Sequence, residues 1–342
     1  MSVWSSNVQS WLQQGRWIVV VAAFLGTSVQ AANHPTLALQ AQRQLERARD
    51  AARRLDYSGV VMHQQGPQSD NYRIAHQADA NEGVVRIEPL DGPPRHMLQR
   101  GRQLTWYLTQ ERVVVHDEPT GVRSFPALSL SSARELLVHY RPRSLATDRV
   151  AGRQAELLQL QPVDGLRYGY RLWFDTITGL LLRAQSISET GQVVAQTSFS
   201  QLSVWAAGGG KSRWREPDVR AWKTEYAVKG KADLSGWSFR LPEGFSQVAA
   251  WRRSMGALQG AHDGSRELVQ IVCSDGLAGL SIFIEPWSEA RSTQPVQRGA
   301  VNMLGKRLGG FWLTIVGETP MAALRQVADS LVFTAPHSNN SP

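Results

Sequence analysis

The sequence is short of cysteine and of long hydrophobic runs. Cys273 is the only cysteine in 342 residues, so no disulfide can form within the chain and stability must come from packing. Cys273 ends the apolar stretch 268–273, and no histidine lies near it in sequence. We therefore interpret it as a small buried residue, because a cysteine nucleophile needs an activating base. The apolar stretch 17–26 is too short for a membrane helix, which needs about 20 residues.

Lysine is absent before position 211. All five lysines lie at or after that position, and arginine supplies the other 32 of the 37 basic residues in a chain of formal net charge +8. Arginine is suited to bidentate capture of carboxylate and phosphate. A basic surface of this kind fits nucleic acid, an anionic lipid head group or an acidic protein segment. A GC-rich genome would also enrich arginine without any such partner.

The N-terminus carries an export signal. Arg16 precedes the apolar stretch 17–26, and Val29, Gln30 and Ala31 form a small-residue cleavage site. We predict a signal peptide at 1–31, cleaved after Ala31. No cysteine follows the apolar stretch, which excludes a lipid anchor at that point. Export also argues against nucleic acid as the partner.

The chain divides by composition into two domains. We expect a first domain at 32–205, a Gly-rich linker at 206–235, a smaller α+β domain at 236–335 and a polar tail at 336–342. In the first domain a helix at 35–55 precedes short strands separated by turn residues, which is typical of an antiparallel meander. Strands are predicted at 57–64, 71–77, 83–90, 97–100, 104–108, 112–116, 155–161, 167–175, 180–189 and 192–204.

Capping residues predict the starts of two further helices. Ser131 or Ser132 can cap a short helix at 133–140, which should end before Pro142. In the second domain Thr319 and Pro320 should begin a helix that runs to Leu331. The remaining second-domain strands are predicted at 247–252, 267–273, 279–285 and 310–316. Together these elements predict an α+β fold with one large curved antiparallel sheet crossed by helices, followed by a smaller α+β domain.

Signatures of catalysis are missing from the sequence. The eight histidines are scattered without an HExxH or other metal-ligand spacing, and there is no GxSxG elbow and no phosphate-binding loop. We therefore predict no catalytic residue, no metal site and no cofactor. A hydrolase whose residues meet only in space stays the less favoured alternative.

Apolar side chains recur with period two on the first domain's strands, which places each group on one face. They form either a closed core or an apolar groove on a half-open sheet. The groove candidates are Val60, Met62, Leu104, Trp106, Leu108, Tyr168, Tyr170, Leu172 and Phe174. Arginines near these positions would rim the groove and hold the anionic head of an amphiphile. These head-group candidates are Arg86, Arg95, Arg100, Arg102, Arg167 and Arg171.

The segment Asp91-Gly92-Pro93-Pro94 interrupts this strand pattern. Consecutive prolines fix φ twice and remove two backbone donors, so neither can lie in a central strand. The segment must be a loop of restricted shape with arginines on both sides. We expect it to shape the mouth of the groove.

Several stretches resemble the MucB/RseB family. Tyr57-Ser-Gly-Val-Val61, Arg73-Ile-Ala-His76 and Glu88-Pro-Leu-Asp-Gly-Pro-Pro-Arg95 are similar to its N-terminal domain, and Ser274–Pro286, SDGLAGLSIFIEP, is similar to its C-terminal domain. They occur in the family's order over about residues 35–335. Pro89 and Pro94 depart from the family's more polar pattern and would stiffen the loop.

The resemblance implies a periplasmic negative regulator of the sigma-E (AlgU-type) envelope stress response. Such a protein binds the periplasmic domain of a membrane anti-sigma factor of the RseA/MucA type and shields it from site-1 proteolysis. It is released on sensing lipopolysaccharide or mislocalised lipoprotein, and it self-associates. The resemblance also implies an unclosed LolA/LolB-like half-barrel for the first domain. A periplasmic lipid or lipoprotein carrier on the same fold is the alternative.

Overall fold

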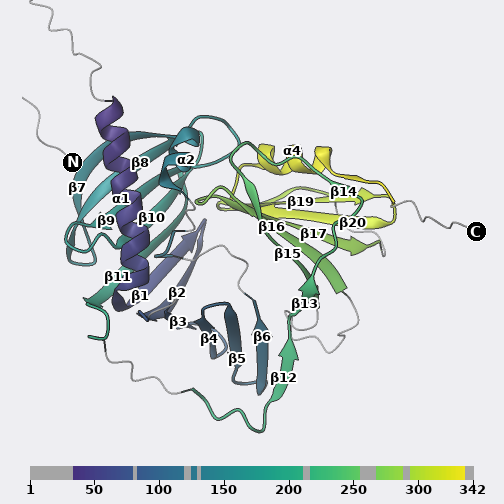
Figure 1. Cartoon of the computed structure of the whole chain (residues 1–342), viewed down its shortest axis with the longest axis horizontal. Helices are drawn as coiled ribbons and strands as arrows, with labels where there is room; N and C mark the ends of the chain where they lie inside the picture. Colours follow the sequence, from purple (N-terminus) through teal and green to yellow (C-terminus); the bar gives the residue numbers. More distant parts are fainter. Residues whose placement is uncertain are drawn as a thin grey trace, which may run out of the picture. The chain divides into compact units, whose positions relative to one another are not determined.

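Short antiparallel strands make up most of the chain in the computed structural model (Figure 1). The structure describes residues 34–79, 83–118, 125–128, 132–210, 216–254, 267–287 and 293–335. The predicted signal peptide and its cleavage site lie outside these ranges, as does the predicted tail. No helix in the described part of the chain has the length and hydropathy of a membrane span.

The larger sheet has 12 strands in the order β12-β6-β5-β4-β3-β2-β1-β11-β10-β9-β8-β7. Its two end strands do not pair with each other, so the sheet is unclosed. All neighbours are antiparallel except β12 and β6, which are parallel. Its elements are α1 (His34–Arg54), β1 (Asp56–Gln65), β2 (Gln68–Gln77), β3 (Val84–Pro89), β4 (Arg95–Arg100), β5 (Gln103–Leu108), β6 (Val113–Asp117), α2 (Ala133–His139), β7 (Tyr140–Val150), β8 (Arg153–Pro162), β9 (Gly169–Asp175), β10 (Leu181–Ile187), β11 (Val193–Trp205) and β12 (Lys223–Tyr226).

The pairing of β1 with β11 joins the N-terminal and C-terminal halves of the meander. Gly59 lies at the centre of this pairing. A Cβ atom at Gly59 would lie 2.3 Å from the carbonyl oxygen of Gln201 and 2.8 Å from the Phe199 ring. Only glycine allows this close approach, and a register shift follows it between Val60 and Val61.

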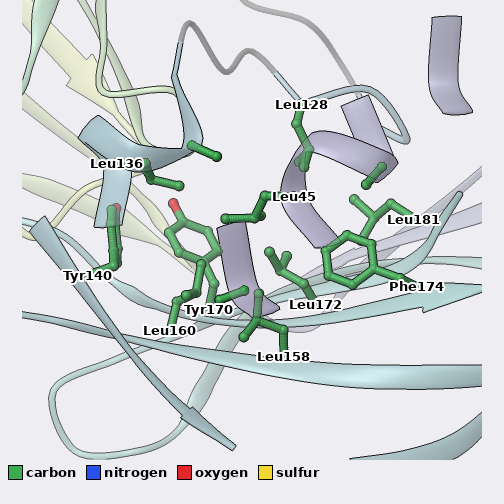
Figure 2. Packing of buried hydrophobic residues seen from close by; sticks show 13 residues of the cluster. Leu45, Leu128, Leu136, Tyr140, Leu158, Leu160, Tyr170, Leu172, Phe174 and Leu181 are labelled. Atoms are coloured by element: carbon green, nitrogen blue, oxygen red, sulfur yellow. The ribbon is translucent and has the colours of Figure 1, made fainter. Parts of the chain in front are cut away.

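Helix α1 lies across the strands of this sheet and closes the main hydrophobic core (Figures 1 and 2). Its Ala41, Leu45 and Ala48 are fully buried, as the helical spacing of Ala and Leu requires. Leu45 packs among side chains from β8 and β9 (Figure 2). Arg47, on the polar side, donates from Nη2 to the carbonyl oxygens of Thr176 (3.0 Å) and Ile177 (2.5 Å), which fixes the helix to the β9–β10 turn.

The smaller sheet has 7 strands in the order β13-β15-β16-β17-β20-β19-β18. Helix α4 (Met321–Ser330) covers one face, where Leu324 and Val327 pack on Ile271, Cys273 and Ile282. Its strands are β13 (Val228–Lys231), β15 (Ser246–Ser254), β16 (Glu267–Ser274), β17 (Gly279–Pro286), β18 (Val296–Arg298), β19 (Val301–Leu308) and β20 (Phe311–Gly317); β14 (Trp237–Ser238) and β21 (Val332–Phe333) form a separate pair.

The predicted fold class is confirmed: a large unclosed antiparallel sheet with few helices, and a second, smaller sheet with its own helix. The cap at Ser132 is also confirmed, since its Oγ accepts a hydrogen bond from the Glu135 amide at 3.2 Å. The cap at Thr319 is wrong. Pro320 occupies the N-cap position of α4 without a side-chain hydrogen bond, and the buried Thr319 hydroxyl has no partner within the described ranges.

Strand β7 is absent from the sequence-based prediction, which assigned no element to residues 141–150 after the helix expected to end before Pro142. Since β7 is an edge strand of the sheet, its proline interrupts no central ladder. The predicted linker, 206–235, contains β12 and β13. Between Gly210 and β12, Val219 and Trp222 pack against Leu98 and Tyr107 on the larger sheet. The glycines of this segment suggested a flexible linker. Much of it is instead ordered, because two apolar side chains pack on the larger sheet and because β12 and β13 pair with the edges of the two sheets.

Candidate functional site

A cavity of about 820 Å³ lies against the larger sheet and is also lined by one end of the smaller sheet. Both sheets belong to the compact unit Pro35–Pro342. Apolar lining comes from Trp106 and Leu172 on the larger sheet and from Leu277 and Val316 on the smaller one. The volume falls within the roughly 300–1,000 Å³ typical of ligand pockets.

The strand register explains why distant side chains meet at this cavity. Ile74 pairs with Ile87, Ile87 with Met97, and Met97 with Trp106, so all of them share one face of the sheet. Across the other half, Leu158 pairs with Leu172, Leu172 with Ala184, and Ala184 with Thr197. This face is the inner face of the sheet, the one that meets α1 and the cavity.

The predicted groove residues divide between this face and other places. Trp106, Tyr170 and Leu172 line the cavity. Leu104 and Leu108 alternate with Thr105 and Tyr107 and so share the face of Trp106 without lining the cavity. Phe174 is fully buried in the core beneath α1, and Tyr168 packs with Ala195 and Ala300.

Val60 and Met62 lie on the opposite, outer face. The register pairs Val60 with Arg73, and Val61 with the cavity-lining Tyr72. Because side chains alternate along a strand, Val61 and His63 take the inner face instead. The sequence pattern grouped Val60 with Met62 but carried no information about which face met the cavity.

Among the predicted head-group residues, Arg95 lines the cavity. Arg86 pairs with Glu88 at 2.5 Å and Arg100 pairs with Glu216. Burial lowers the pKa of Arg86, and Glu88 opposes that shift. Arg102 is exposed near Glu118, and Arg171 lies between Gln159 and Gln185 on the outer face. The structure therefore does not assemble these arginines into a ring.

Arg167, the remaining candidate, is completely buried. Its guanidinium donates to Asp275 Oδ2 at 3.0 Å, to the Glu243 carbonyl oxygen at 2.5 Å and to Asp164 Oδ1 at 3.1 Å. The Tyr140 hydroxyl donates to the same Asp275 oxygen at 3.0 Å. The protein's own acceptors thus occupy this arginine, which connects the larger sheet's β8–β9 loop to the smaller sheet's β16–β17 turn.

A second buried ion pair spans the two sheets. Arg253 of β15 contacts both carboxylate oxygens of Asp117 of β6, at 2.6 and 2.5 Å, and also donates to Gln270 at 2.7 Å. The two charged side chains are only 5% and 7% exposed. A buried ion pair is costly to disrupt from one side, since the partner charge is left desolvated. The two pairs therefore connect the larger sheet to the smaller one.

Three carboxylates at the cavity were not among the head-group candidates predicted from sequence. Asp70 lies near the start of β2, Asp91 belongs to the proline loop, and Glu318 follows β20. The Asn71 side chain donates to Asp91 at 3.3 Å and so orients it. Asp91 lies within the proline loop that the sequence predicted at the mouth of the groove, and only the structure places its carboxylate at the cavity.

The phenols of the cavity remain protonated. Burial raises the pKa of Tyr72 to about 12. Burial also raises the pKa of Tyr170 well above its ordinary value, and the carboxylates of Asp275 and Glu318 add to the shift. The site therefore combines apolar walls with neutral phenols and a rim of mixed charge. Within the described residues, no group of three His, Cys, Asp or Glu side chains is placed to hold a metal ion. Such a site is suited to binding.

Two family models match the chain. The MucB/RseB N-terminal domain matches residues 40–221, and the MucB/RseB C-terminal domain matches residues 231–332. The sigma factor AlgU regulatory protein MucB of Pseudomonas aeruginosa is 29% identical over 315 residues, which cover 86% of this chain and 92% of MucB. The sigma-E factor regulatory protein RseB of Salmonella typhimurium is 26% identical over 323 residues, covering 92% of this chain and 96% of RseB.

The fold agrees with these matches. The MucB chain in the complex structure of Pseudomonas aeruginosa MucA/MucB has a TM-score of 0.65 and 25% identity, over 87% of this chain and 100% of that one. Since both family domains match in order and together span most of the sequence, the chain belongs to the MucB/RseB family, which includes these sigma factor regulatory proteins.

Proposed function

We propose that this protein is a periplasmic negative regulator of a sigma-E-type stress response, acting by binding the periplasmic domain of a membrane anti-sigma factor of the RseA/MucA type. The observation that carries the proposal is the similarity, at TM-score 0.65 and 25% identity, to a MucB whose structure is that of a complex with the periplasmic part of MucA. The export signal predicted at residues 1–31 agrees with this location.

The proposal has a protective and a sensing part. The bound protein shields the anti-sigma factor from site-1 proteolysis, and an amphiphile in the cavity, lipopolysaccharide or the acyl chain of a mislocalised lipoprotein, releases it. The cavity supports the sensing part because it offers Trp106, Leu172 and Leu277 to an acyl chain. Release requires that the amphiphile bind the free protein more tightly than the complex, since a ligand shifts an equilibrium only by its differential affinity. Self-association of the protein is part of the proposal.

The test uses the exported chain, residues 32–342, and the periplasmic segment of the anti-sigma factor encoded beside it. Isothermal titration measures the affinity, and the rate of site-1 cleavage of the segment is measured with and without the protein. We expect stable binding and slower cleavage. No binding, or an unchanged cleavage rate, would overturn the regulator proposal. Amphiphile binding without segment binding would instead support the carrier alternative.

The sensing part has its own measurement. Adding a lipopolysaccharide or a synthetic lipopeptide to the preformed complex should restore cleavage of the segment. The variant Trp106→Ala serves as the control, because it removes an apolar wall of the cavity and should leave the complex protected at the same amphiphile concentration. Equal release from both proteins would show that the cavity does not act as the sensor.

A further inference from the structure

The proline loop places opposite charges at one corner of the cavity. Asp91 opens the loop and Arg95 begins β4 directly after it, and both line the cavity. Pro93 and Pro94 restrict the backbone between them, while Gly92 takes the left-handed conformation, φ +78°, that the turn requires. The loop's covalent structure therefore restricts the backbone positions from which Asp91 and Arg95 extend.

Neighbouring strands anchor this corner on both sides. The Leu90 amide donates to the Asn71 carbonyl oxygen at 2.8 Å, and the Asn71 side chain donates to Asp91 at 3.3 Å. The Thr109 amide donates to the Pro94 carbonyl oxygen at 3.3 Å. Asp70, the residue before Asn71, also lines the cavity. The corner is thus a constrained arrangement of two carboxylates and one guanidinium.

The balance of charge around the cavity is negative. The described lining residues include the carboxylates Asp70, Asp91 and Glu318 and one guanidinium, Arg95, while the lining His63 shares a hydrogen bond of 2.8 Å with Thr197. At the proline loop a purely anionic head group would be attracted by Arg95 and repelled by Asp70 and Asp91. A head group with only a cation would leave Arg95 unused. A head group that carries both charges matches both kinds of residue.

We infer that the cavity mouth selects amphiphiles with a zwitterionic head, in which a phosphate lies beside Arg95 and an ammonium group beside Asp70 and Asp91. This inference rests on the proposed sensing function and ranks its ligands: for the same acyl chain, a zwitterionic head is preferred to a purely anionic one. The acyl chain extends over Trp106 and Leu172. Arg95 and a phosphate form a charge-assisted hydrogen bond, and the ammonium group supplies donors to the two carboxylates.

Two single-chain lipids with the same acyl chain test the inference. Myristoyl lysophosphatidylethanolamine carries phosphate and ammonium, whereas myristoyl lysophosphatidylglycerol carries phosphate alone. Both are titrated below their micelle concentrations into the full exported chain, with Trp fluorescence or calorimetry as the readout. We expect the ethanolamine lipid to bind about two- to fivefold more tightly at low salt, the range for one or two solvent-accessible ion pairs. High salt should reduce this preference.

Substitutions that remove single charges show which residues cause the preference for the ethanolamine lipid. The double variant Asp70→Asn/Asp91→Asn should lose the preference for the ethanolamine lipid, and Arg95→Gln should weaken both lipids about equally. Glu111→Gln, which removes a carboxylate from the exposed β5–β6 turn, is the matched control and should keep the wild-type ratio. All four residues are exposed, so the substitutions disturb no core.

The possible results separate the inference from the function on which it rests. Equal or tighter binding of the glycerol lipid to the wild-type protein would overturn the zwitterion inference while leaving the amphiphile sensor intact. A preference that survives in the double aspartate variant would overturn it as well. Binding of neither lipid, together with no binding of lipopolysaccharide or lipopeptide, would overturn the sensing function itself.

Discussion

Arg167 and Asp275 form an ion pair with a nitrogen–oxygen distance of 3.0 Å and side-chain exposures of 0% and 1%. The two residues come from different sheets. Asp275 also accepts hydrogen bonds at its other oxygen from the amides of Leu277, at 2.9 Å, and Ala278, at 2.7 Å. One carboxylate therefore shapes the β16–β17 turn at the cavity and holds the buried arginine that reaches it.

Breaking this pair should destabilise the protein strongly. Arg167→Met removes the guanidinium and leaves Asp275 desolvated with fewer donors, for which we expect a loss of about 3–5 kcal/mol in the free energy of unfolding. Urea denaturation followed by circular dichroism measures it. Arg102→Met, at an arginine with 84% side-chain exposure, should change stability by less than about 0.5 kcal/mol. If Arg167→Met lowered the free energy of unfolding as little as Arg102→Met does, the buried pair would contribute little to stability.

The packing of α1 can be tested with two leucines of the same helix. Leu45 is fully buried in the core and Leu39 is 46% exposed. Leu45→Ala should cost about 2–5 kcal/mol because it leaves a cavity beneath the helix. Leu39→Ala should cost far less and is the control for helix propensity. Similar losses in both variants would contradict the packing of α1 described above.

Mutations on one strand can distinguish a residue that lines the cavity from a neighbour that does not. Trp106→Ala should weaken binding of a lipopeptide or lysophospholipid at least severalfold, since an aromatic wall is lost. Leu104→Ala is the control, because Leu104 shares the strand face but does not line the cavity. Fluorescence or calorimetric titration measures both affinities, and circular dichroism checks the fold. Equal affinities would argue that the amphiphile binds elsewhere.

The single thiol gives a prediction about pH. Burial raises the pKa of Cys273 from its ordinary 9.0 to about 12. The folded thiol therefore holds its proton between about pH 9 and pH 12, while the unfolded thiol loses it, so the free energy of unfolding should fall across that window. Tyr72, raised from 10.0 to about 12, adds to the fall.

Comparison with Cys273→Ala isolates the contribution of the thiol. Stability measured by urea unfolding at several pH values should fall less steeply in this variant than in the wild type. Thiol-specific reagents should also react slowly with the folded protein and rapidly in denaturant, since the side chain is fully buried. Rapid labelling of the folded protein would contradict this burial.

Local patterns predicted much of the secondary structure. The period-two strands on either side of the β3–β4 turn, the helical spacing of Ala41, Leu45 and Ala48, and the Ser132 cap are signals that act within a few residues. They appear in the structure where the sequence indicated them. Strands β7 and β12 were missed for different reasons. Residues 140–150 were assigned no strand after the helix expected to end before Pro142, although their partner β8 is the next strand in the chain. Strand β12 follows glycines that suggested a linker, and it pairs with the distant strand β6.

The sequence by itself determined the family, the unclosed antiparallel fold, the burial of Cys273 and the rigid turn at Asp91–Pro94, because each depends on neighbouring residues or on an ordered set of short motifs. The composition of the site was decided by the tertiary structure. Arg167 finds Asp275 at a distance of 108 positions in the sequence, and strand register turns Trp106 toward the cavity and Val60 away from it. The partner of a buried charge and the sheet face that meets a cavity both depend on contacts between residues far apart in the sequence. No local pattern specifies such contacts.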